Sequence, residues 1–304
     1  ISIMGPTGIG KTNLAFELYD SADVEIISVD SVQVYKHLNI GSGKPDKKVL
    51  IKYPHKLIDV IDPHENYSTG KFQKDCLKEI KKASSSKKIP LLVGGTMLYF
   101  KNLFHGLSEL PESTEEIRQE VELECNKKGL EVMHEYLQQI DPFSAKNIHP
   151  NDSQRIKRAI EVYRLTNKPL SVWQQENHLE VHEDLKSFDI HQFAIRPKDK
   201  ETHREKVAIR FQDMIDQGLI EEVERLLKKK QMNSSKSSMK SVGYKQISDY
   251  LEGNLSFDEM VFRAVTATRQ LAKRQMTWLR SWNRVIWLEE ESDNNLDVVL
   301  DTIN

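Results

Sequence analysis

Short apolar runs alternate with longer stretches of mixed hydrophobic and polar residues along this chain. The runs lie at positions 1–4, 24–30, 90–95, 189–195 and 284–289; they are rich in Ile, Leu and Val and are bounded by turn-forming residues. Continuous apolar runs of this length predict strands that are buried on both faces, and the intervening stretches have the spacing of amphipathic helices. The alternation predicts an α/β fold in which helices flank a parallel sheet.

The stretch at 106–188 interrupts this alternation. It contains no convincing strand, and its segments STEEIRQEVELECNKKG and SQRIKRAIEVYRLTNK have helical spacing. We therefore expect two domains. One is a sheet domain made of residues 1–105 and 189–304, and the other is a helical insertion domain made of residues 106–188.

Two features follow the fourth apolar run. Residues 203–230 carry a continuous amphipathic pattern, with Val207, Phe211, Met214 and Ile215 on one face, which predicts a helix. The segment NSSKSSMKS, residues 233–241, is polar and rich in serine. Its composition predicts a mobile loop.

A glycine-rich loop, GPTGIGKT, follows the first apolar run and precedes a helical pattern. The spacing G-x-x-x-x-G-K-T between a strand and a helix is typical of a phosphate-binding loop (P-loop), in which backbone N–H groups converge on an anion. The sheet domain is therefore expected to be P-loop NTPase-like. Lys11 would neutralise phosphate oxygens, and the Thr12 hydroxyl would be a ligand of a phosphate-bound Mg²⁺ ion. The predicted phosphate-binding residues are Gly5, Pro6, Thr7, Gly8, Ile9, Gly10, Lys11 and Thr12.

The P-loop alone does not define the chemistry, because kinases, ATPases, GTPases and some transferases share it. In a parallel sheet, ligands bind at the carboxyl ends of the strands. Asp30, Ser31 and residues 94–96 follow such strand ends, so we expect them to share one cleft with the loop. Asp30 has two interpretations: it holds Mg²⁺ through water, or it is a general base beside the phosphates.

Charge is distributed unevenly along the chain. The formal net charge is -2, which excludes a globally basic nucleic-acid binder. Residues 263–284 nevertheless contain six Arg or Lys and no acid, and residues 154–164 contain four cations against one glutamate. These clusters favour a surface that faces a polyanion, and solvated helix faces are the alternative. Trp278 and Trp282 lie in the first cluster, and core packing is favoured over stacking on bases.

Composition excludes several other classes of protein. With 304 residues, of which 38% are hydrophobic, the chain can bury a sizeable core, and no apolar run approaches the roughly 18 residues of a membrane-spanning helix. Cys76 and Cys125 are isolated, so we expect reduced thiols and neither a disulfide framework nor a cysteine metal site. A cytoplasmic protein is expected. The sequence starts at Ile1 inside the first predicted strand, so we expect a few residues to precede it.

Seven stretches together resemble one family. They are GPTGIGKT, SVDSVQVYKHLNIGSGKP, YPHKLIDVIDP, LLVGGTMLYFKNL, IHPNDSQRIKRAIEVYRLT, SVGYKQ and ATRQLAKRQMTWLR, in this order along the chain. Their sequence and order are similar to the motifs of the bacterial tRNA dimethylallyltransferases, also called delta-2-isopentenyl pyrophosphate transferases. The departures are modest: GIG stands where the family's loop often has ASG, and SGKP where TAKP is common. Neither departure removes a functional group.

The resemblance implies a reaction. A dimethylallyl group would pass from dimethylallyl diphosphate to the exocyclic amine of the adenosine 3′-adjacent to the anticodon in tRNA, with release of diphosphate. The P-loop would then hold a leaving group, with Mg²⁺ as the cofactor. The sequence does not indicate whether ATP also binds the P-loop as a competitor. The resemblance also implies that the target base leaves its stack in the anticodon loop.

The resemblance further assigns residues of this chain to roles. Asp30 matches the family's general base, Thr96 a position beside the target base, and Arg210 a second diphosphate clamp. The positions that match tRNA contacts are Asp30, Ser31, Val32, Gln33, Thr96, Arg118, Gln154, Arg155, Ile156, Lys157, Arg158, Lys240, Ser241, Val242, Gly243, Tyr244 and Lys245. From the residues alone, Thr96 is equally suited to cap a helix, and Arg210 to be a surface cation on an amphipathic helix.

Two other functions are carried as alternatives. One is a P-loop small-molecule or nucleoside kinase that uses ATP, and the other is a non-catalytic RNA-binding module that retains a nucleotide loop. The helical insertion and the basic clusters favour the RNA substrate. We expect a monomer, because one tRNA needs only one cleft. The sequence does not indicate which tRNAs are substrates.

Overall fold

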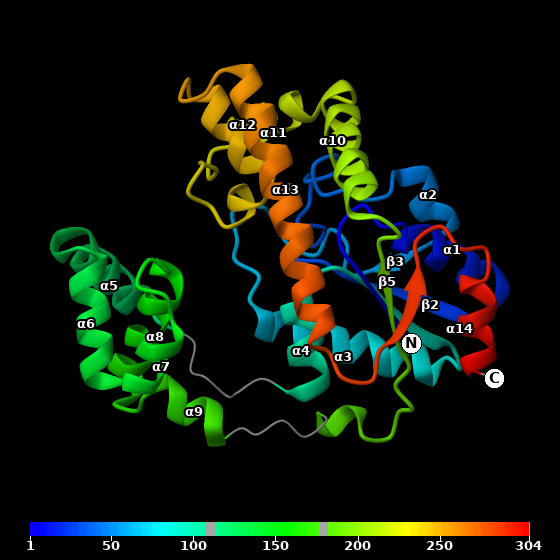
Figure 1. Cartoon of the computed structure of the whole chain (residues 1–304), viewed down its shortest axis with the longest axis horizontal. Coiled ribbons are helices and arrows are strands. Elements are labelled where there is room, and N and C mark those ends of the chain that lie inside the picture. The colour runs from blue at the N-terminus through cyan, green and yellow to red at the C-terminus, as the bar shows by residue number, and fades with distance from the viewer. Residues whose placement is uncertain (107–112, 177–181, 304) are drawn as a thin grey trace. The chain divides into compact units, whose positions relative to one another are not determined.

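The structure, a computed structural model, describes residues 1–106, 113–176 and 182–303 (Figure 1). Contacts between residues divide the chain into two compact units. The core unit consists of Ile1–Leu103 and Lys186–Asn304, and the insertion unit of Phe104–Leu185. The two units are described separately below.

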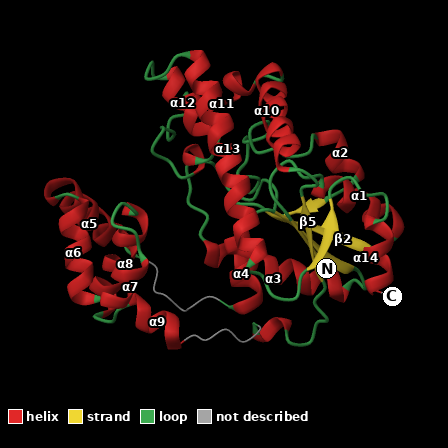
Figure 2. Cartoon of the chain, in the orientation of Figure 1, coloured by secondary structure: helices red, strands yellow, loops and turns green. Residues whose placement is uncertain are grey.

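The core unit is an α/β unit (Figure 2). Its described residues form the strands β1 (Ser2–Met4), β2 (Val24–Val29), β3 (His55–Lys56), β4 (Ile89–Gly94), β5 (Gln192–Arg196) and β6 (Ile286–Glu289). They also form the helices α1 (Lys11–Ser21), α2 (Lys47–Lys52), α3 (Thr69–Ser85), α4 (Met97–His105, which ends beyond the unit boundary), α10 (Lys200–Asp216), α11 (Leu219–Leu227), α12 (Tyr244–Leu251), α13 (Phe257–Arg280) and α14 (Asn295–Ile303). None of the helices described in either unit is long and apolar enough to cross a membrane.

The strands form one sheet in the order β3-β2-β4-β1-β5-β6, and every pair is parallel. This confirms the predicted α/β class with a parallel sheet. All five predicted strands are present, shifted by no more than a few residues at their ends. The additional strand β3 was not predicted, because two residues at the edge of a sheet carry no hydrophobic pattern.

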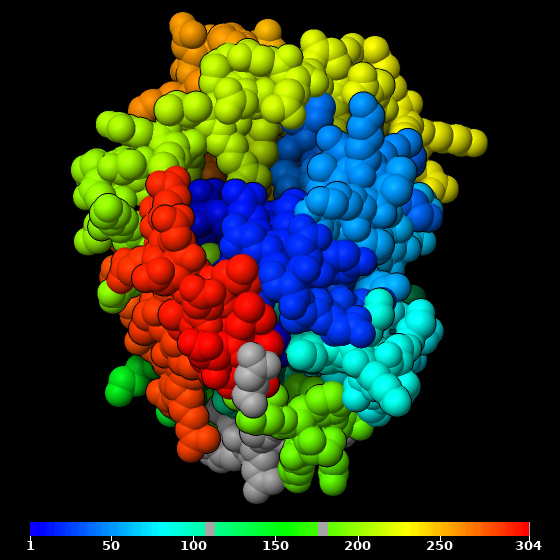
Figure 3. All heavy atoms as spheres, turned by 90° about the vertical axis from the view of Figure 1, so that its right-hand side faces the viewer, coloured from blue at the N-terminus to red at the C-terminus, as the bar shows by residue number. Residues whose placement is uncertain are grey.

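Residues from both ends of the chain cover one face of the sheet. Leu14, Ala15 and Leu18 of α1 and Val299 of α14 belong to one buried cluster with alternate residues of the strands. The N-terminal residues, in blue, and the C-terminal residues, in red, accordingly lie side by side in Figure 3. The P-loop thus connects the buried strand β1 to α1, whose inner face is buried against the sheet.

The helices α10 to α13 build a second hydrophobic cluster in the core unit. The predicted helix at 203–230 is divided at Gly218, whose φ of 94° is left-handed and ends α10 before α11 begins. The segment 233–241, predicted as a mobile loop, contains a short 3-10 helix at Ser238–Lys240, and Met239 in it is fully buried in the cluster. The Ser238 hydroxyl also donates a hydrogen bond to the Pro63 carbonyl at 2.7 Å. This segment is therefore anchored rather than detached.

The described residues of the insertion unit contain helices and no strand. The helices are α5 (Glu115–Lys128), α6 (Leu130–Ile140), α7 (Pro142–Asn147), α8 (Ser153–Thr166) and α9 (Leu170–Glu176), followed by a 3-10 turn at Glu183–Leu185. Val121, Met133, Leu137, Ile156 and Ile160 form the centre of a separate core, which lies within this unit. The insertion unit thus has a hydrophobic core of its own.

Glu222 of α11 fixes two loops of the core unit to each other. Its side chain is 4% exposed and accepts hydrogen bonds from the backbone N–H groups of Asn39, Ile40 and Gly41, at 3.1, 2.9 and 3.3 Å. It also accepts one from the Tyr244 hydroxyl, at 2.7 Å. These four donors compensate the buried charge, so the loop after β2 and the start of α12 depend on one carboxylate.

We predict that Glu222→Gln destabilises the core unit by about 2 kcal/mol, because an amide NH₂ would face donors that the carboxylate now satisfies. Glu221→Gln is the matched control, since Glu221 is exposed on the same helical turn. It should change stability by less than about 0.5 kcal/mol. Urea denaturation followed by circular dichroism measures both variants. Equal midpoints for the two variants would contradict the anchoring role of Glu222.

Candidate active site

The P-loop presents backbone donors to one side of the sheet. Gly8 and Gly10 have φ angles of 77° and 92°, a left-handed conformation that strongly favours glycine. Gly10 is also the N-cap of α1, and no side chain caps this helix. Within the described part of the chain, the N–H groups of residues 8–12 have no protein acceptor. The loop therefore offers several donors and the positive end of a helix dipole to an anion.

Lys11 and Arg210 bring positive charge to this loop. The Lys11 ammonium donates hydrogen bonds to the carbonyls of Gly5 and Pro6 at 2.9 and 2.7 Å. Burial lowers the pKa of Lys11 to about 7; nearby Asp30 opposes this shift, and Arg210 adds to it. Burial likewise lowers the pKa of Arg210, and Asp30 again opposes the shift. Both cations thus lie in a poorly solvated environment with one carboxylate nearby. Binding of an additional anion is favoured there, because it would stabilise the charged forms of both side chains.

Arg210 reaches the loop from α10, far along the chain. A Cβ atom added to Gly43 would lie 2.0 Å from its Nη2 atom, and one added to Gly8 would lie 4.0 Å from its Nη1 atom. The guanidinium group therefore lies between the P-loop and the loop after β2. Arg210 is therefore not a cation on an exposed helix face, which was the alternative interpretation of this residue.

Asp30 follows β2 and faces the same region. Its Oδ1 atom accepts hydrogen bonds from the N–H groups of Val32 and Gln33, at 2.8 and 3.2 Å. Its Oδ2 atom accepts none from the described residues. One oxygen therefore fixes the orientation of the carboxylate, and the other is available to a ligand or a proton.

Thr96 connects the ends of β4 and β2. Its hydroxyl accepts a hydrogen bond from the Ser31 N–H at 3.1 Å, and its carbonyl accepts from Tyr99 and Phe100 in the first turn of α4. Thr96 thus precedes the helix as the capping alternative requires, but its hydroxyl bonds to Ser31 and not to the helix. Because Ser31 directly follows Asp30, this bond holds Thr96 next to the segment that carries Asp30, and both residues line one cavity.

Two adjoining cavities bring these residues together. The first, of about 340 Å³, is lined among others by Thr7, Gly8, Asp30, Ser31, Val32, Thr96, Arg210, Val242 and Gly243. The second, of about 100 Å³, is lined among others by Gly8, Ile9, Gly10, Lys11, Thr12, Asp30, Gln33 and Arg210. Residues 7–12 of the predicted phosphate-binding loop and the predicted base therefore share one cleft, whereas Gly5 and Pro6 line neither cavity.

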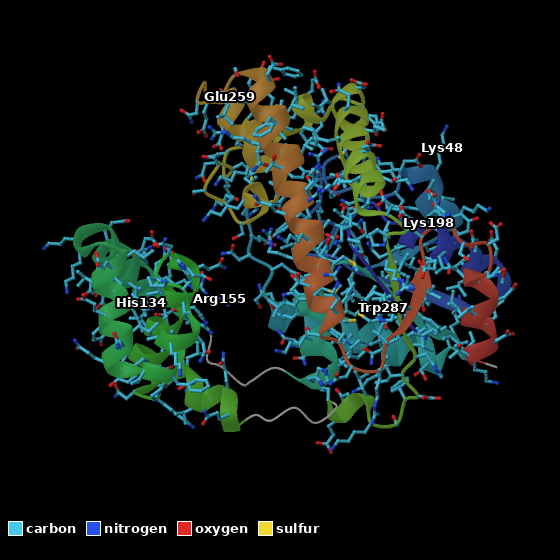
Figure 4. All side chains as sticks on the ribbon, in the orientation of Figure 1. Lys48, His134, Arg155, Lys198, Glu259 and Trp287 are labelled. Carbon is cyan, nitrogen blue, oxygen red and sulfur yellow. The ribbon has the colours of Figure 1, made fainter. Side chains whose placement is uncertain are left out.

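The remaining predicted residues lie elsewhere in their units. Lys240 and Lys245 are exposed, whereas Tyr244 is fully buried against Glu222. Arg118, Gln154, Arg155, Ile156, Lys157 and Arg158 belong to α5 and α8 of the insertion unit. Arg155 is exposed on α8 (Figure 4), but Ile156 is fully buried, so its side chain is a core residue.

Two residues of α13 in the first cavity were not identified from the sequence as site residues. Gln275 is 8% exposed and lines both cavities, and Trp278 lines the larger of the two. Trp278 is half-buried with Lys101 over its ring, at 5.7 Å, and Trp282 donates to Gln192. Trp278 and Gln275 are three residues apart on one helix face, which is the pattern that could have identified them.

A larger cavity, of about 1150 Å³, lies between α10 and α13. Arg196, Lys200, Lys273 and Arg280 line it, together with His203. His203 is 6% exposed, and neither ring nitrogen has a partner within the described residues. Burial lowers its pKa, which favours the neutral form of the ring. The candidate site is nonetheless placed at the smaller cavities, because these contain the P-loop, Asp30 and Thr96.

Known proteins resemble this chain over nearly its whole length. The sequence profile of the IPP transferases matches residues 33–282. A tRNA isopentenylpyrophosphate transferase from Bacillus halodurans has a TM-score of 0.71 at 30% identity, covering 99% of this chain and 94% of that one. A tRNA delta(2)-isopentenylpyrophosphate transferase from Staphylococcus epidermidis has a TM-score of 0.69 at 33% identity, covering 99% and 96%.

A eukaryotic dimethylallyltransferase acting on tRNA has the same fold, with a TM-score of 0.78 at 24% identity, over 99% of this chain and 76% of that one. Because the identity is only 24%, this similarity shows a shared fold and nothing more. The family profile, in contrast, matches residues 33–282, which is most of the chain, and the two bacterial relatives are 30% and 33% identical over 99% of it. This chain belongs to the IPP transferase family.

Proposed function

We propose that this protein transfers a dimethylallyl group from dimethylallyl diphosphate to the exocyclic amine of the adenosine 3′-adjacent to the anticodon in tRNA. The observation that carries the proposal is one cleft in which P-loop donors, Lys11 and Arg210 adjoin Asp30 and Thr96. Membership of the family favours this reaction over the kinase and over the non-catalytic RNA-binding module. The P-loop then holds a leaving group and not the phosphates of a kinase substrate.

The cationic side of the cleft suits the departing diphosphate. In the reaction the amine nitrogen bonds to the allylic carbon, the carbon–oxygen bond breaks, and its electron pair leaves on a diphosphate oxygen. Lys11, Arg210 and the N–H groups of residues 8–12 would stabilise that charge as it grows. Because these groups are already in place, little reorganisation is needed at the transition state.

Asp30 and Thr96 suit the acceptor side. The lone pair of adenine's exocyclic amine is shared with the ring, so the amine must lose a proton as its bond to carbon forms. The Oδ2 atom of Asp30 would accept that proton, and Oδ1 remains bonded to the backbone of Val32 and Gln33. Thr96 would orient the base, since it lines the same cavity as Asp30.

Mg²⁺ fits this site only together with a substrate. No cluster of three acidic, histidine or cysteine side chains exists in the described parts of the chain. Thr12 lines the smaller cavity at the N-terminus of α1, so its hydroxyl would supply one ligand and the diphosphate oxygens the others. When bound, the ion would neutralise charge on the leaving group.

The tRNA anticodon stem-loop is the second substrate in this proposal. Ser31, Val32, Gln33 and the segment 240–245 would contact it around the cleft, and Arg118 with residues 154–158 would contact it from the insertion unit. Ile156 would contribute through its backbone, because its side chain is buried. We further propose a cytoplasmic monomer in which ATP is at most a competitor for the P-loop.

Transfer of label tests the function directly. With radiolabelled dimethylallyl diphosphate, Mg²⁺ and unmodified tRNA, label should enter tRNA at the adenosine next to the anticodon. Replacing that adenosine with guanosine in the transcript is the control and should abolish the label. Absence of label from tRNA, together with Mg²⁺-dependent ATP turnover on a small acceptor, would contradict the proposal.

We predict that Asp30→Asn lowers the single-turnover rate by about 100-fold or more, because an amide cannot accept the amine proton. Binding of tRNA should change little. Asp23→Asn is the control, since Asp23 is exposed before β2. If Asp30 instead held Mg²⁺, excess metal would restore the rate. Full rescue across a Mg²⁺ titration would therefore refute the base assignment.

The insertion unit is tested by charge reversal. Arg155→Glu with Arg158→Glu should weaken tRNA binding by about tenfold or more at low salt, because phosphate contacts dominate such affinity. Binding of pyrophosphate should be unchanged. Lys127→Glu with Lys146→Glu makes the same charge change at exposed positions of this unit. If both double variants lost the same tRNA affinity, the loss would come from the change in net charge and not from contacts of Arg155 and Arg158.

A further inference from the structure

Gln275 joins the P-loop to the end of β4. Its Oε1 atom accepts a hydrogen bond from the Thr7 N–H at 3.0 Å, and its Nε2 atom donates to the Gly95 carbonyl at 2.8 Å. The side chain is buried, and a Cβ atom added to Gly95 would lie 2.5 Å from Nε2. One amide group therefore holds two backbone segments that are far apart in sequence.

These two segments carry opposite halves of the cleft. Thr7 precedes the loop residues that face Lys11 and Arg210, and Gly95 precedes Thr96. Gln275 is also adjacent in sequence to Arg274, and Arg274 and Trp278 of α13 line the cavity of about 340 Å³ with it. A movement of α13 would therefore be transmitted to both halves through this side chain.

We propose that Gln275 is a positioning residue that sets the distance between the donor's diphosphate and the acceptor base. This inference rests on the proposed function and deepens it. The carbon–nitrogen bond forms as the carbon–oxygen bond breaks, so the reacting atoms must lie about 3–3.5 Å apart, and a 1 Å misplacement can cost about 100-fold in rate. Although Gln275 lines both cavities, its two hydrogen bonds go to Thr7 and Gly95, and in this role it acts through them.

The chemistry of the amide explains why a glutamine suits the position. It supplies one acceptor for Thr7 and one donor for Gly95 from the same planar group. A methionine has similar length but supplies neither bond, and a glutamate would turn an oxygen toward the Gly95 carbonyl. Either substitution would leave the Thr7 N–H or the buried Gly95 carbonyl without its hydrogen-bond partner. An unpaired buried group of this kind destabilises the local structure.

The kinetic test compares Gln275→Met with Gln270→Met, since Gln270 is exposed on the same helix. At saturating tRNA and dimethylallyl diphosphate, Gln275→Met should lower kcat by about 10-fold to 100-fold. The dissociation constants of pyrophosphate and of tRNA should change by less than about threefold, and Gln270→Met should resemble the wild type. Unchanged kcat, or a loss that appears only in the two dissociation constants, would overturn the proposal.

A second measurement does not depend on activity. Hydrogen exchange of the peptide that contains Thr7 should be faster in Gln275→Met than in the wild type and in Gln270→Met. Gly95→Ala should also speed exchange at Thr7, because its added Cβ atom would displace the Gln275 amide from the β4 end of the link. Unchanged exchange in both variants would refute the link. If the wild type failed to label tRNA, the proposed function would fail, and the exchange data would still decide whether Gln275 holds the loop.

Discussion

The arrangement of this site depends on positive charge that is buried at the carboxyl ends of parallel strands. Lys11 and Arg210 lose hydration there, and burial lowers the pKa of both, while Asp30 is the carboxylate near them. Buried charge without full compensation is costly, so the site is most stable when an anion completes it. The same groups favour charge that develops on a leaving diphosphate, and this links folding of the cleft to the proposed reaction.

Distant parts of the chain must meet for this charge to be placed. The parallel sheet brings the ends of β1, β2 and β4 to one edge, which positions the P-loop, Asp30 and Thr96 from the first hundred residues. Arg210 and Gln275 arrive from α10 and α13, more than a hundred residues later. The packing of these helices on one another in a separate hydrophobic cluster therefore decides how well the cleft is formed.

Features with a local signal were predictable from the sequence. The P-loop, the five main strands and the positions of Asp30 and Thr96 at strand ends all follow from short contiguous patterns. Gln275 and Glu222 were missed, because the backbone groups that they bind lie about 180 or more residues away, which no local pattern encodes. Lys44 also lacked a local signal: its side chain is 3% exposed and pairs with Asp59, fifteen residues along the chain, at 2.7 Å. Ile156 was predicted to contact tRNA together with its basic neighbours. The helical periodicity of α8, however, directs its side chain into the hydrophobic core of the insertion unit.

The central claim is that the P-loop holds a leaving group whose bond to carbon breaks. Dimethylallyl diphosphate labelled with ¹⁸O at the bridging oxygen tests it, when the enzyme, Mg²⁺ and unmodified tRNA are supplied and the products are weighed by mass spectrometry. The account predicts that the released diphosphate retains ¹⁸O and that tRNA gains the dimethylallyl group without it. Recovery of ¹⁸O in dimethylallyl alcohol, which requires cleavage between phosphorus and oxygen, would contradict the account.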